Sequence, residues 1–369
     1  LHVVKNGTPD LINRTVREAM EIAKPGGGFI IGSSDSFREG TSTENIKAYF
    51  DAYLKYVPGW APHFARAGMP PATEAPHSIA SPEDFELTIS ANDLFATARM
   101  ATRSTNAFPH QVELSVTLFR SQPYVDLEWK LVGKKPDQWP EAGWLAFPFQ
   151  VDEPSFRLGR LGSVIDPAAD ARDGSNFDVF CLNSGMTITG ADGGGVGLCP
   201  VDSPLVSIGR PGLYRHTGRF GSRDPVVFVN LFNNVWGTNF QQWTEGTWSS
   251  RIRIWSVEGK GVEADLITPG WQARSPAIAA YFSGRPGTVL PTRSGIELSR
   301  KGVLVTAFGP NPDRRGILLR IWEQAGRDGP CRVRLPEEMD VTRVQPRDLR
   351  GLPQGDPIAL DDGSIDVPM

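Results

Sequence analysis

Residues 124–131, Tyr-Val-Asp-Leu-Glu-Trp-Lys-Leu, alternate apolar and polar side chains along the whole stretch. Side chains of a β-strand point alternately to its two faces, so this period of two gathers the apolar residues on one face. Comparable patterns predict further strands at 85–90, 113–118, 225–232, 249–257, 302–308, 316–322 and 331–335. The sequence therefore predicts antiparallel sheets that each have one buried and one solvated face.

The composition supports a turn-rich β protein of considerable size. Among 369 residues there are 39 Gly and 31 Pro, while hydrophobic residues make up 40% and charged residues 22% of the chain. This hydrophobic content is sufficient for a large core and excludes wholesale disorder. No notable helical pattern follows residue 83, so we expect a mainly β fold built as a large antiparallel β-sandwich.

Charge and cysteine content exclude several classes of protein. The net charge is only -4 and no long basic run occurs, which argues against a nucleic-acid partner. No run of about 18 apolar residues is present, so no membrane-spanning helix is expected. The five His and three Cys lack the spacing of metal ligands, and we expect neither a metal site nor a cofactor in this chain.

The first 57 residues have a different pattern, which predicts a short α–β–α segment. Thr8 can cap a helix that begins at Pro9, and Thr41 with Glu44 forms a capping box for a second helix. Between these helices, residues 29–31 read as a buried strand. The alternation is typical of the end of a (β/α)₈ barrel, which needs about 250 residues in full.

Domain boundaries follow from these changes in pattern. We expect an incomplete α–β–α part, a Pro- and Gly-rich linker and the sandwich, at residues 1–57, 58–80 and 81–369. The chain starts Leu-His-Val-Val, without Met and without a signal-peptide pattern, and we interpret it as a fragment.

The loop Asn233–Trp243 offers the densest set of groups that suit a sugar. Side-chain amides both donate and accept hydrogen bonds, and indole faces can pack on the apolar side of a pyranose. The alternative is a structural loop that Trp side chains anchor and in which Asn residues adopt turn conformations. The candidate sugar-binding residues are Asn233, Asn234, Trp236, Thr238, Asn239 and Trp243.

Two carboxylates, Asp126 and Glu128, share one face of the strand at 124–131. A glycosidase could use two carboxylates at about the 7 Å that separates alternate strand residues. The alternative is an ordinary solvated strand face, and no further residue pattern distinguishes the pair.

Residues 8–56 resemble the C-terminal end of the uroporphyrinogen decarboxylase superfamily, which also contains corrinoid-dependent methyltransferases. The resemblance rests on Gly26-Gly27-Gly28-Phe29-Ile30, Ser33-Ser34-Asp35-Ser36 and Thr41-Ser42-Thr43-Glu44-Asn45-Ile46. It implies that Ser34 and Asp35 lie on the loop after the last barrel strand. True decarboxylases have a His in this loop where this chain has Asp35, which argues against porphyrin decarboxylation.

Residues 83–369 resemble the C-terminal β-sandwich region of α-mannosidase-like enzymes of glycoside hydrolase family 38. The matching blocks are 124–129, 141–149, 202–206, 233–243 and 318–327. The resemblance implies a galactose-mutarotase-like sandwich that packs on a separate catalytic barrel. It also implies that the nucleophile and zinc ligands belong to that barrel, and that loop 233–243 meets the substrate.

Three functions stay open at this point. The leading hypothesis is a carbohydrate-active protein, in which this chain supplies a sugar-binding and support sandwich and is inactive without its catalytic barrel. Zinc would then belong to an intact relative, and the partners would be a carbohydrate and the missing barrel. The alternatives are a truncated decarboxylase- or methyltransferase-like enzyme with a sandwich appendage, and a non-catalytic sugar-binding or structural β module.

Overall fold

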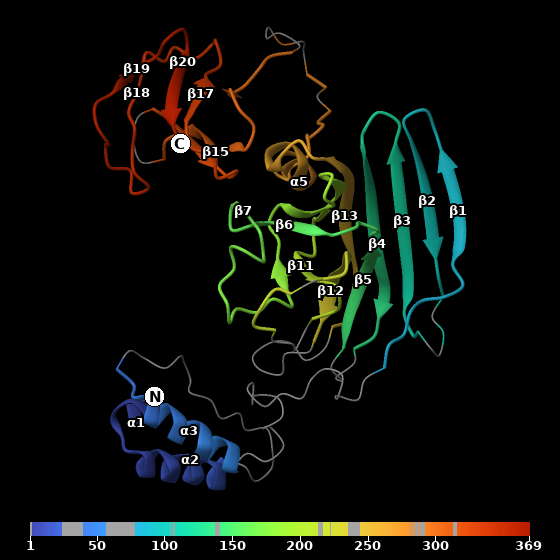
Figure 1. The fold of residues 1–369 in the computed structure, drawn as a ribbon, viewed down its shortest axis with the longest axis vertical. Helices are drawn as coiled ribbons and strands as arrows, with labels where there is room; N and C mark the ends of the chain where they lie inside the picture. The colour runs from blue at the N-terminus through green and yellow to red at the C-terminus, as the bar shows by residue number, and fades with distance from the viewer. Residues whose placement is uncertain are drawn as a thin grey trace. The chain divides into compact units, whose positions relative to one another are not determined.

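The computed structural model divides the chain into two compact units, residues 1–77 and 78–369. It describes residues 2–23, 40–56, 78–103, 105, 108–136, 141–212, 217–221, 223–234, 244–281, 283–284, 287, 292–312 and 316–369. Figure 1 shows the course of the chain in both units.

The described part of the first unit consists of helices α1 (His2–Asn6), α2 (Pro9–Ala23) and α3 (Thr43–Tyr56). Ile12 of α2 and Ala52 of α3 lie in a small shared apolar core. The expected cap of α2 is confirmed, since Thr8 Oγ1 accepts a hydrogen bond from the Leu11 N–H at 3.3 Å. The expected strand at 29–31 lies outside the described residues.

The predicted capping box of α3 was wrong by one residue. Ser42, not Thr41, caps the helix, because Ser42 Oγ accepts a hydrogen bond from the Asn45 N–H at 3.1 Å. Ser, Thr, Asp and Asn all serve as N-caps, so a run of such residues leaves the position of the cap undecided.

The second unit is mainly β, as the sequence predicted. Its first sheet has nine strands in the order β1-β2-β3-β4-β13-β10-β9-β6-β7, and its second has four in the order β5-β12-β11-β8. The strands of the nine-stranded sheet are β1 (Glu86–Ala91), β2 (Phe95–Ala101), β3 (Gln111–Phe119), β4 (Tyr124–Lys134), β6 (Ser155–Arg160), β7 (Ser163–Ile165), β9 (Gly185–Thr189), β10 (Gly194–Pro200) and β13 (Gly246–Glu258). The four-stranded sheet contains β5 (Ala142–Pro148), β8 (Phe180–Cys181), β11 (Leu205–Ile208) and β12 (Val226–Asn233).

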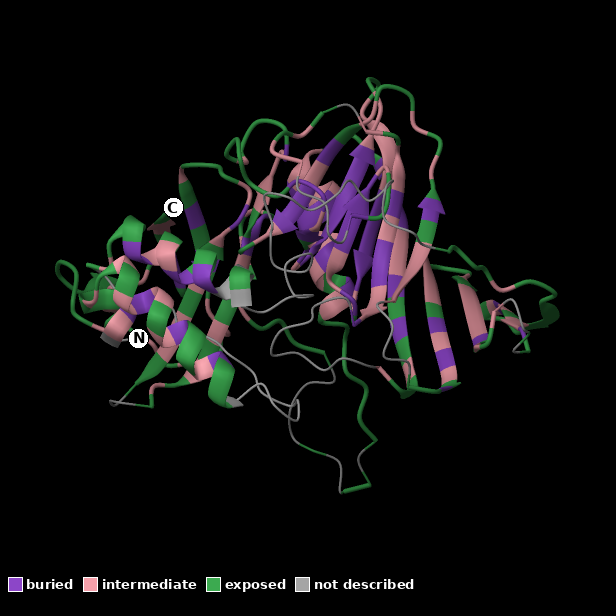
Figure 2. Cartoon of the chain, turned by 90° about the horizontal axis from the view of Figure 1, so that it is seen from below, coloured by how far each residue is buried: buried purple, intermediate pink, exposed green. Residues whose placement is uncertain are grey.

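These two sheets pack face to face and form the expected sandwich. Buried residues from both sheets make one continuous core, and Figure 2 shows buried residues gathered on the central strands. Leu158 and Ile252 contribute to this core from the large sheet, and Val206 and Val229 from the small one. In the register between β4 and β13, Leu127 lies opposite Ile252, so the apolar side chains of the two strands share one face of the sheet.

The small sheet covers only part of this apolar face. Across β1, β2 and β3 the paired residues Leu87, Met100 and Leu114 share the face that continues into the core. Yet β1 and β2 contribute no side chain to the core described above, and Leu87 and Ile89 of β1 are 57% and 69% exposed. The described structure therefore leaves an apolar sheet surface uncovered beyond the edge of the small sheet.

A helical turn that the sequence analysis missed covers part of the other face of the large sheet. The π-helix η2 (Glu263–Ile267) leads into α5 (Thr268–Arg274), and Leu266 packs against Trp255 of β13. Trp255 Nε1 donates a hydrogen bond to the Asp265 carbonyl at 2.8 Å, which fixes the turn on the sheet. Pro269 and Gly270 within α5 are residues typical of helix ends and turns, and they conceal the helix in the sequence.

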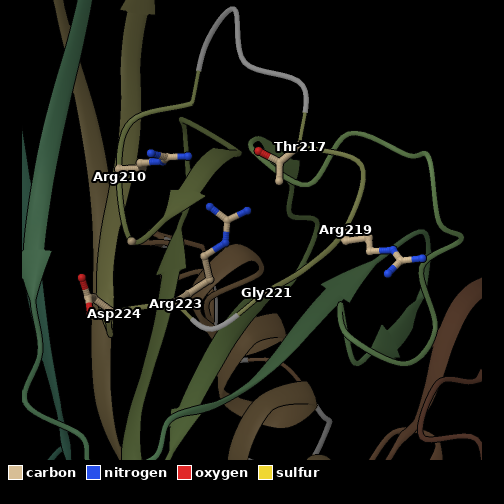
Figure 3. Close-up of a pocket in the computed structure, with 7 residues that line it drawn as sticks. Arg210, Thr217, Arg219, Gly221, Arg223 and Asp224 are labelled. Atoms are coloured by element: carbon tan, nitrogen blue, oxygen red, sulfur yellow. The ribbon is translucent and has the colours of Figure 1, made fainter. Parts of the chain in front are cut away.

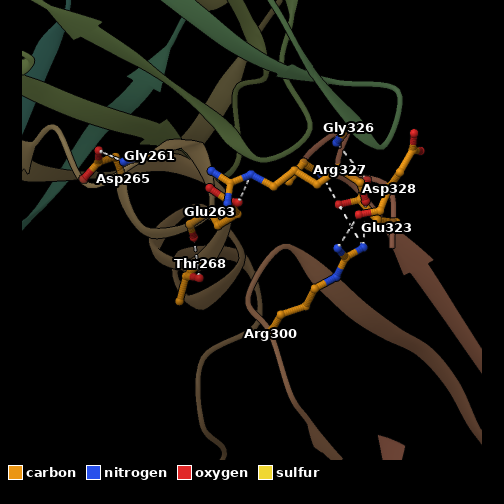
Figure 4. A network of polar contacts seen from close by, with 10 residues as sticks. Gly261, Glu263, Asp265, Thr268, Arg300, Glu323, Gly326, Arg327 and Asp328 are labelled. Atoms are coloured by element: carbon orange, nitrogen blue, oxygen red, sulfur yellow. Dashed lines mark hydrogen bonds and ion pairs between the residues drawn. The ribbon is translucent and has the colours of Figure 1, made fainter. Parts of the chain in front are cut away.

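The last third of the unit forms three small sheets. Their strands are β14 (Glu297–Leu298), β17 (Pro330–Arg334) and β20 (Ser364–Pro368) in one, β15 (Val303–Pro310) and β16 (Ile317–Glu323) in the second, and β18 (Arg343–Val344) and β19 (Ile358–Ala359) in the third. Arg327 after β16 forms an ion pair of 2.6 Å with the buried Glu263 of η2, and Arg300 donates to the Arg327 carbonyl at 2.7 Å (Figure 4). Trp271 of α5 donates to Gln324 Oε1 at 2.7 Å. These contacts join the small sheets to the helical turn on the sandwich.

Candidate functional site

The predicted sugar-binding loop starts at the end of β12, where its first two residues are held by the neighbouring strand. Asn234 Oδ1 accepts a hydrogen bond from the Glu141 N–H at 2.6 Å, and the Asn234 N–H donates to the Glu141 carbonyl at 3.1 Å. Asn233 Nδ2 donates to Asn230 Oδ1 at 2.7 Å. Asn230 in turn donates to the carbonyls of Gly143 and Phe232, both at 3.2 Å. These amides therefore link the start of the loop to β5.

A buried lysine joins both ends of the same loop. The Lys134 side chain at the end of β4 is 0% exposed and forms an ion pair with Glu141. Its ammonium group also donates hydrogen bonds to the Lys135 carbonyl at 3.1 Å and to the Thr244 carbonyl at 2.9 Å. A buried ammonium requires such partners, because an unpaired charge in the interior is very costly. The base of the loop is thus a built polar cluster, which the sequence analysis did not find.

The remaining candidates lie outside the described residues. They are the loop residues Trp236, Thr238, Asn239 and Trp243 and the barrel-loop residues Ser34 and Asp35. Their roles stay predictions. A bulge between Asn230 and Phe232 is the signal that the chain leaves the regular sheet just before this loop.

The carboxylates on β4 lie on the face that carries the charged side chains of the large sheet. Asp126 accepts two hydrogen bonds from the guanidinium of Arg253 on β13, at 2.6 and 2.7 Å. The Arg253 guanidinium also lies 3.7 Å from the centre of the Tyr124 ring. An arginine held bidentately by one carboxylate stabilises the sheet pairing. These contacts fit the interpretation of a charged strand face better than that of a catalytic pair.

The next arginine on the same strand makes a second bidentate pair. Arg251 donates from Nε and Nη2 to Asp202, both at 2.8 Å. These hydrogen bonds hold the pKa of Asp202 below its ordinary value. Burial acts in the opposite direction on the nearby Cys199 and raises the pKa of its thiol to about 11. Asp202 is therefore ionised, and Cys199 protonated, at neutral pH.

An arginine-lined pocket of about 410 Å³ lies in the long connection between β11 and β12 (Figure 3). This connection passes over residues 173–178 before β8, where the buried Asp178 accepts hydrogen bonds from the Thr217 N–H at 2.6 Å and from Thr217 Oγ1 at 2.9 Å. The sequence carried a signal for this pocket that the sequence analysis overlooked. Four arginines and one aspartate occur between residues 210 and 224: Arg210, Arg215, Arg219, Arg223 and Asp224.

Among the described residues, no three His, Cys, Asp or Glu side chains come together in a group that could hold a metal ion. None of the described helices is both long and apolar enough to pass through a membrane.

Comparisons with known proteins point to one fold. No protein-family model matches the chain, and no curated protein sequence matches it. Among solved structures, a protein in glycosyl hydrolase family 38 from Enterococcus faecalis matches with a TM-score of 0.54 and 12% identity, over 70% of this chain and 33% of that one. An alpha-mannosidase from Enterococcus faecalis V583 matches with a TM-score of 0.52 and 13% identity, over 68% of this chain and 31% of that one.

The chain thus spans about a third of the length of these two proteins. At such identities the likeness concerns the fold, and it leaves activity and substrate open. The resemblance of residues 8–56 to the decarboxylase superfamily is not tested by these comparisons and stays a prediction. The chain shares its large antiparallel β fold with structures of glycoside hydrolase family 38.

Proposed function

We propose that the second unit is the sugar-binding and support sandwich of an α-mannosidase-like glycoside hydrolase, in which a separate barrel performs catalysis. The observation that carries the proposal is the unequal size of the two sheets, nine strands against four. The uncovered apolar surface on β1 and β2 is what a support sandwich needs for a neighbouring domain.

The occupant that we propose for this surface is the catalytic barrel itself. The surface is continuous with the sandwich core, so a domain packed there would extend an existing apolar interface. The two matched structures each have about two thirds of their length outside the match, which is ample for such a domain.

Sugar binding is assigned to the loop Asn233–Trp243. Its two ends are anchored. Asn234 accepts a hydrogen bond from the Glu141 N–H just before β5, and the Thr244 carbonyl accepts one from Lys134 at the end of β4. One stacked indole and a few neutral hydrogen bonds contribute about 1 kcal/mol each, so we expect millimolar affinity for a monosaccharide.

Titration of the full chain with methyl α-mannoside tests this assignment. Trp236→Ala should weaken binding about fivefold to tenfold, since a stacking contact is worth about 1 kcal/mol. The melting temperature should barely change. Trp322→Ala is the matched control, because Trp322 on β16 is 49% exposed and lies outside the loop. A parent chain that binds no mannoside, together with a large loss of stability in Trp236→Ala, would show that the loop is structural.

Two measurements test the support role. The chain alone should hydrolyse no aryl mannoside above the buffer rate, with or without added zinc, because catalysis would belong to the barrel. Sedimentation velocity should give a monomer for the parent and for Leu118→Glu. Leu118 of β3 is 55% exposed and lies on the same face as Leu114, so this variant places a charge on the uncovered surface. A dimer that Leu118→Glu abolishes would mean that a second copy covers the surface, and it would contradict the barrel as occupant.

A further inference from the structure

The arginine-lined pocket is a second candidate site, separate from the loop Asn233–Trp243. It is built by the connection from β11 to β12, whose flanking residues Ile208 and Val227 are paired in the small sheet. A connection of this length over a sheet end is a common place for a binding site.

The described parts of this connection are firmly held. Besides the two hydrogen bonds from Thr217 to Asp178, the Gly174 N–H donates to the Gly218 carbonyl at 2.8 Å. Phe220 packs against the sandwich core and contacts the rings of Phe156 and Phe180. The pocket wall is therefore anchored to the sandwich by polar and apolar contacts.

Arg223 is fixed more tightly than a surface arginine. Its side chain is 9% exposed, and its guanidinium lies 5.5 Å from the centre of the Phe220 ring. Nη2 donates to the Phe177 carbonyl at 3.3 Å and lies 3.7 Å from Asp178 Oδ1. A guanidinium has five N–H donors, so these contacts leave donors for a ligand.

Arg210 adds a second positive charge to the pocket. Among the residues that the structure describes, no carboxylate forms an ion pair with Arg210. Figure 3 shows the guanidinium groups of Arg210 and Arg223 extending toward the same space beside Thr217. The Asp224 carboxylate points away from that space, and Arg219 is paired with Asp173 at 3.4 Å. The centre of the pocket is thus lined by cationic donors.

Thr217 adds an acceptor beside these donors. Its hydroxyl donates to Asp178, so its oxygen lone pairs are oriented away from that carboxylate. Arginine donors suit the oxygens of a carboxylate or a sulfate, and a hydroxyl oxygen suits the hydroxyl groups of a sugar. A volume of about 410 Å³ is sufficient for a monosaccharide.

We infer that this pocket binds a sugar that carries an anionic group, with Arg210 and Arg223 on the anion and Thr217 on a sugar hydroxyl. The sugar part of the inference rests on the proposed function, whereas the anion part rests on the arginines alone. This anionic group is an oxyanion. It is either the carboxylate of a sugar acid or the sulfate of a sulfated sugar, and the titration distinguishes the two.

Titration of the full chain with sodium glucuronate, glucose and glucose 6-sulfate tests the inference. Glucuronate or glucose 6-sulfate should bind at least tenfold more tightly than glucose, because one charge-assisted contact is worth about a factor of ten or more. The tighter of the two identifies the oxyanion. Added NaCl should weaken this binding, and it should leave methyl α-mannoside binding unchanged.

Arg210→Gln should reduce the affinity for glucuronate or glucose 6-sulfate about fivefold to tenfold, since the substitution removes one charged donor. Arg210 is exposed, so this variant should fold, and Arg223→Gln is the second variant. Arg343→Gln on β18 is the matched control, because it removes an exposed arginine from another sheet. The inference would be overturned if neither glucuronate nor glucose 6-sulfate bound more tightly than glucose, or if Arg210→Gln left the affinity for the tighter anionic sugar unchanged.

The outcomes separate this inference from the proposed function. Binding of glucuronate without any binding of methyl α-mannoside would support the pocket and count against the mannosidase-type loop. Binding of inorganic sulfate as tightly as glucose 6-sulfate would overturn the sugar part, because the ring would then contribute nothing.

Discussion

Lys134 Nζ donates a hydrogen bond of 2.9 Å to the Thr244 carbonyl, a residue 110 positions further along the chain. Through this contact, and through its ion pair with Glu141, one buried ammonium joins the end of β4 to the residue after the loop Asn233–Trp243 and to the residue that holds Asn234 at the start of the loop. The anchoring of the two ends of the loop therefore depends on a residue that does not belong to the loop.

Lys134→Met should lower the free energy of unfolding by about 3 kcal/mol, because it leaves Glu141 and two carbonyl groups without their partner. Lys130→Met is the matched control on the same strand. The Lys130–Glu113 pair is about 40% exposed on each side chain, and such surface pairs contribute about 0–1 kcal/mol. Urea unfolding of both variants measures the difference, and equal losses would contradict a structural role for Lys134.

Gly197→Ala should destabilise the sandwich by about 1–3 kcal/mol through overpacking. A Cβ on Gly197 would lie 2.1 Å from the Trp255 ring, and the hydrogen bond from Trp255 to Asp265 prevents the ring from moving away. Gly309→Ala on β15 is the control, because no heavy atom lies within 4 Å of the added Cβ. A thermal melt compares the two, and a Gly197→Ala variant as stable as the parent would show that the turn over β13 yields easily.

Only one of the three thiols should react rapidly with dithionitrobenzoate in the folded protein. Cys181 is exposed, whereas Cys199 and Cys331 are buried, and burial raises the pKa of Cys199 to about 11. The thiolate is the reactive form, so Cys199 stays inert at about pH 8. Cys181→Ser should abolish the fast phase, and all remaining thiols should react after denaturation. A fast phase that survives in Cys181→Ser would contradict the burial of the other two.

Asp202→Asn should reduce stability at neutral pH, and the loss should shrink as the solution is made acidic. Arg251 holds the pKa of Asp202 below its ordinary value of 3.8, so the folded state favours the ionised carboxylate. Stability from this pair is complete above pH 3.8 and is lost as the pH falls through the lower folded value. Unfolding free energies of parent and variant between neutral pH and about pH 3 measure this, in the range where carboxyl groups titrate.

Asp93→Asn provides the comparison for this pH series. Asp93 is exposed in the bend between β1 and β2, and the described structure gives it no ion pair. This variant removes a carboxylate without removing an ion pair from the described structure. A gap between parent and Asp202→Asn that stays constant into acid would mean that the Arg251 pair does not hold the carboxylate.

Local sequence patterns predicted eight of the twenty strands that the structure describes, because the faces of an amphipathic strand are encoded in neighbouring residues. The strand expected at 225–232 is β12 (Val226–Asn233), and the one expected at 331–335 is β17 (Pro330–Arg334). Patterns failed where a distant contact decides the local structure. Gly270 stands inside α5 because a Cβ there would lie 1.8 Å from the Ser184 carbonyl oxygen, and no local rule reveals that approach.

The candidate site shows the same division. The amides and indoles of Asn233–Trp243 are visible in the sequence, but the cluster around Lys134 is not, since its members are separated by up to 110 residues. The arginines between 210 and 223 are visible too. Only the folded connection shows that Arg210 and Arg223 extend toward one space while Arg219 pairs with Asp173.

The sequence by itself determined that this protein is a large β protein, because a period of two in hydrophobicity is a local property that chain geometry converts into sheet faces. The tertiary structure alone decided that β4 pairs with β13 and β13 with β10, and that the small sheet covers only part of the large one. These pairings join residues that are distant in the sequence, and their free energy comes from burial in a common core that no single segment contains.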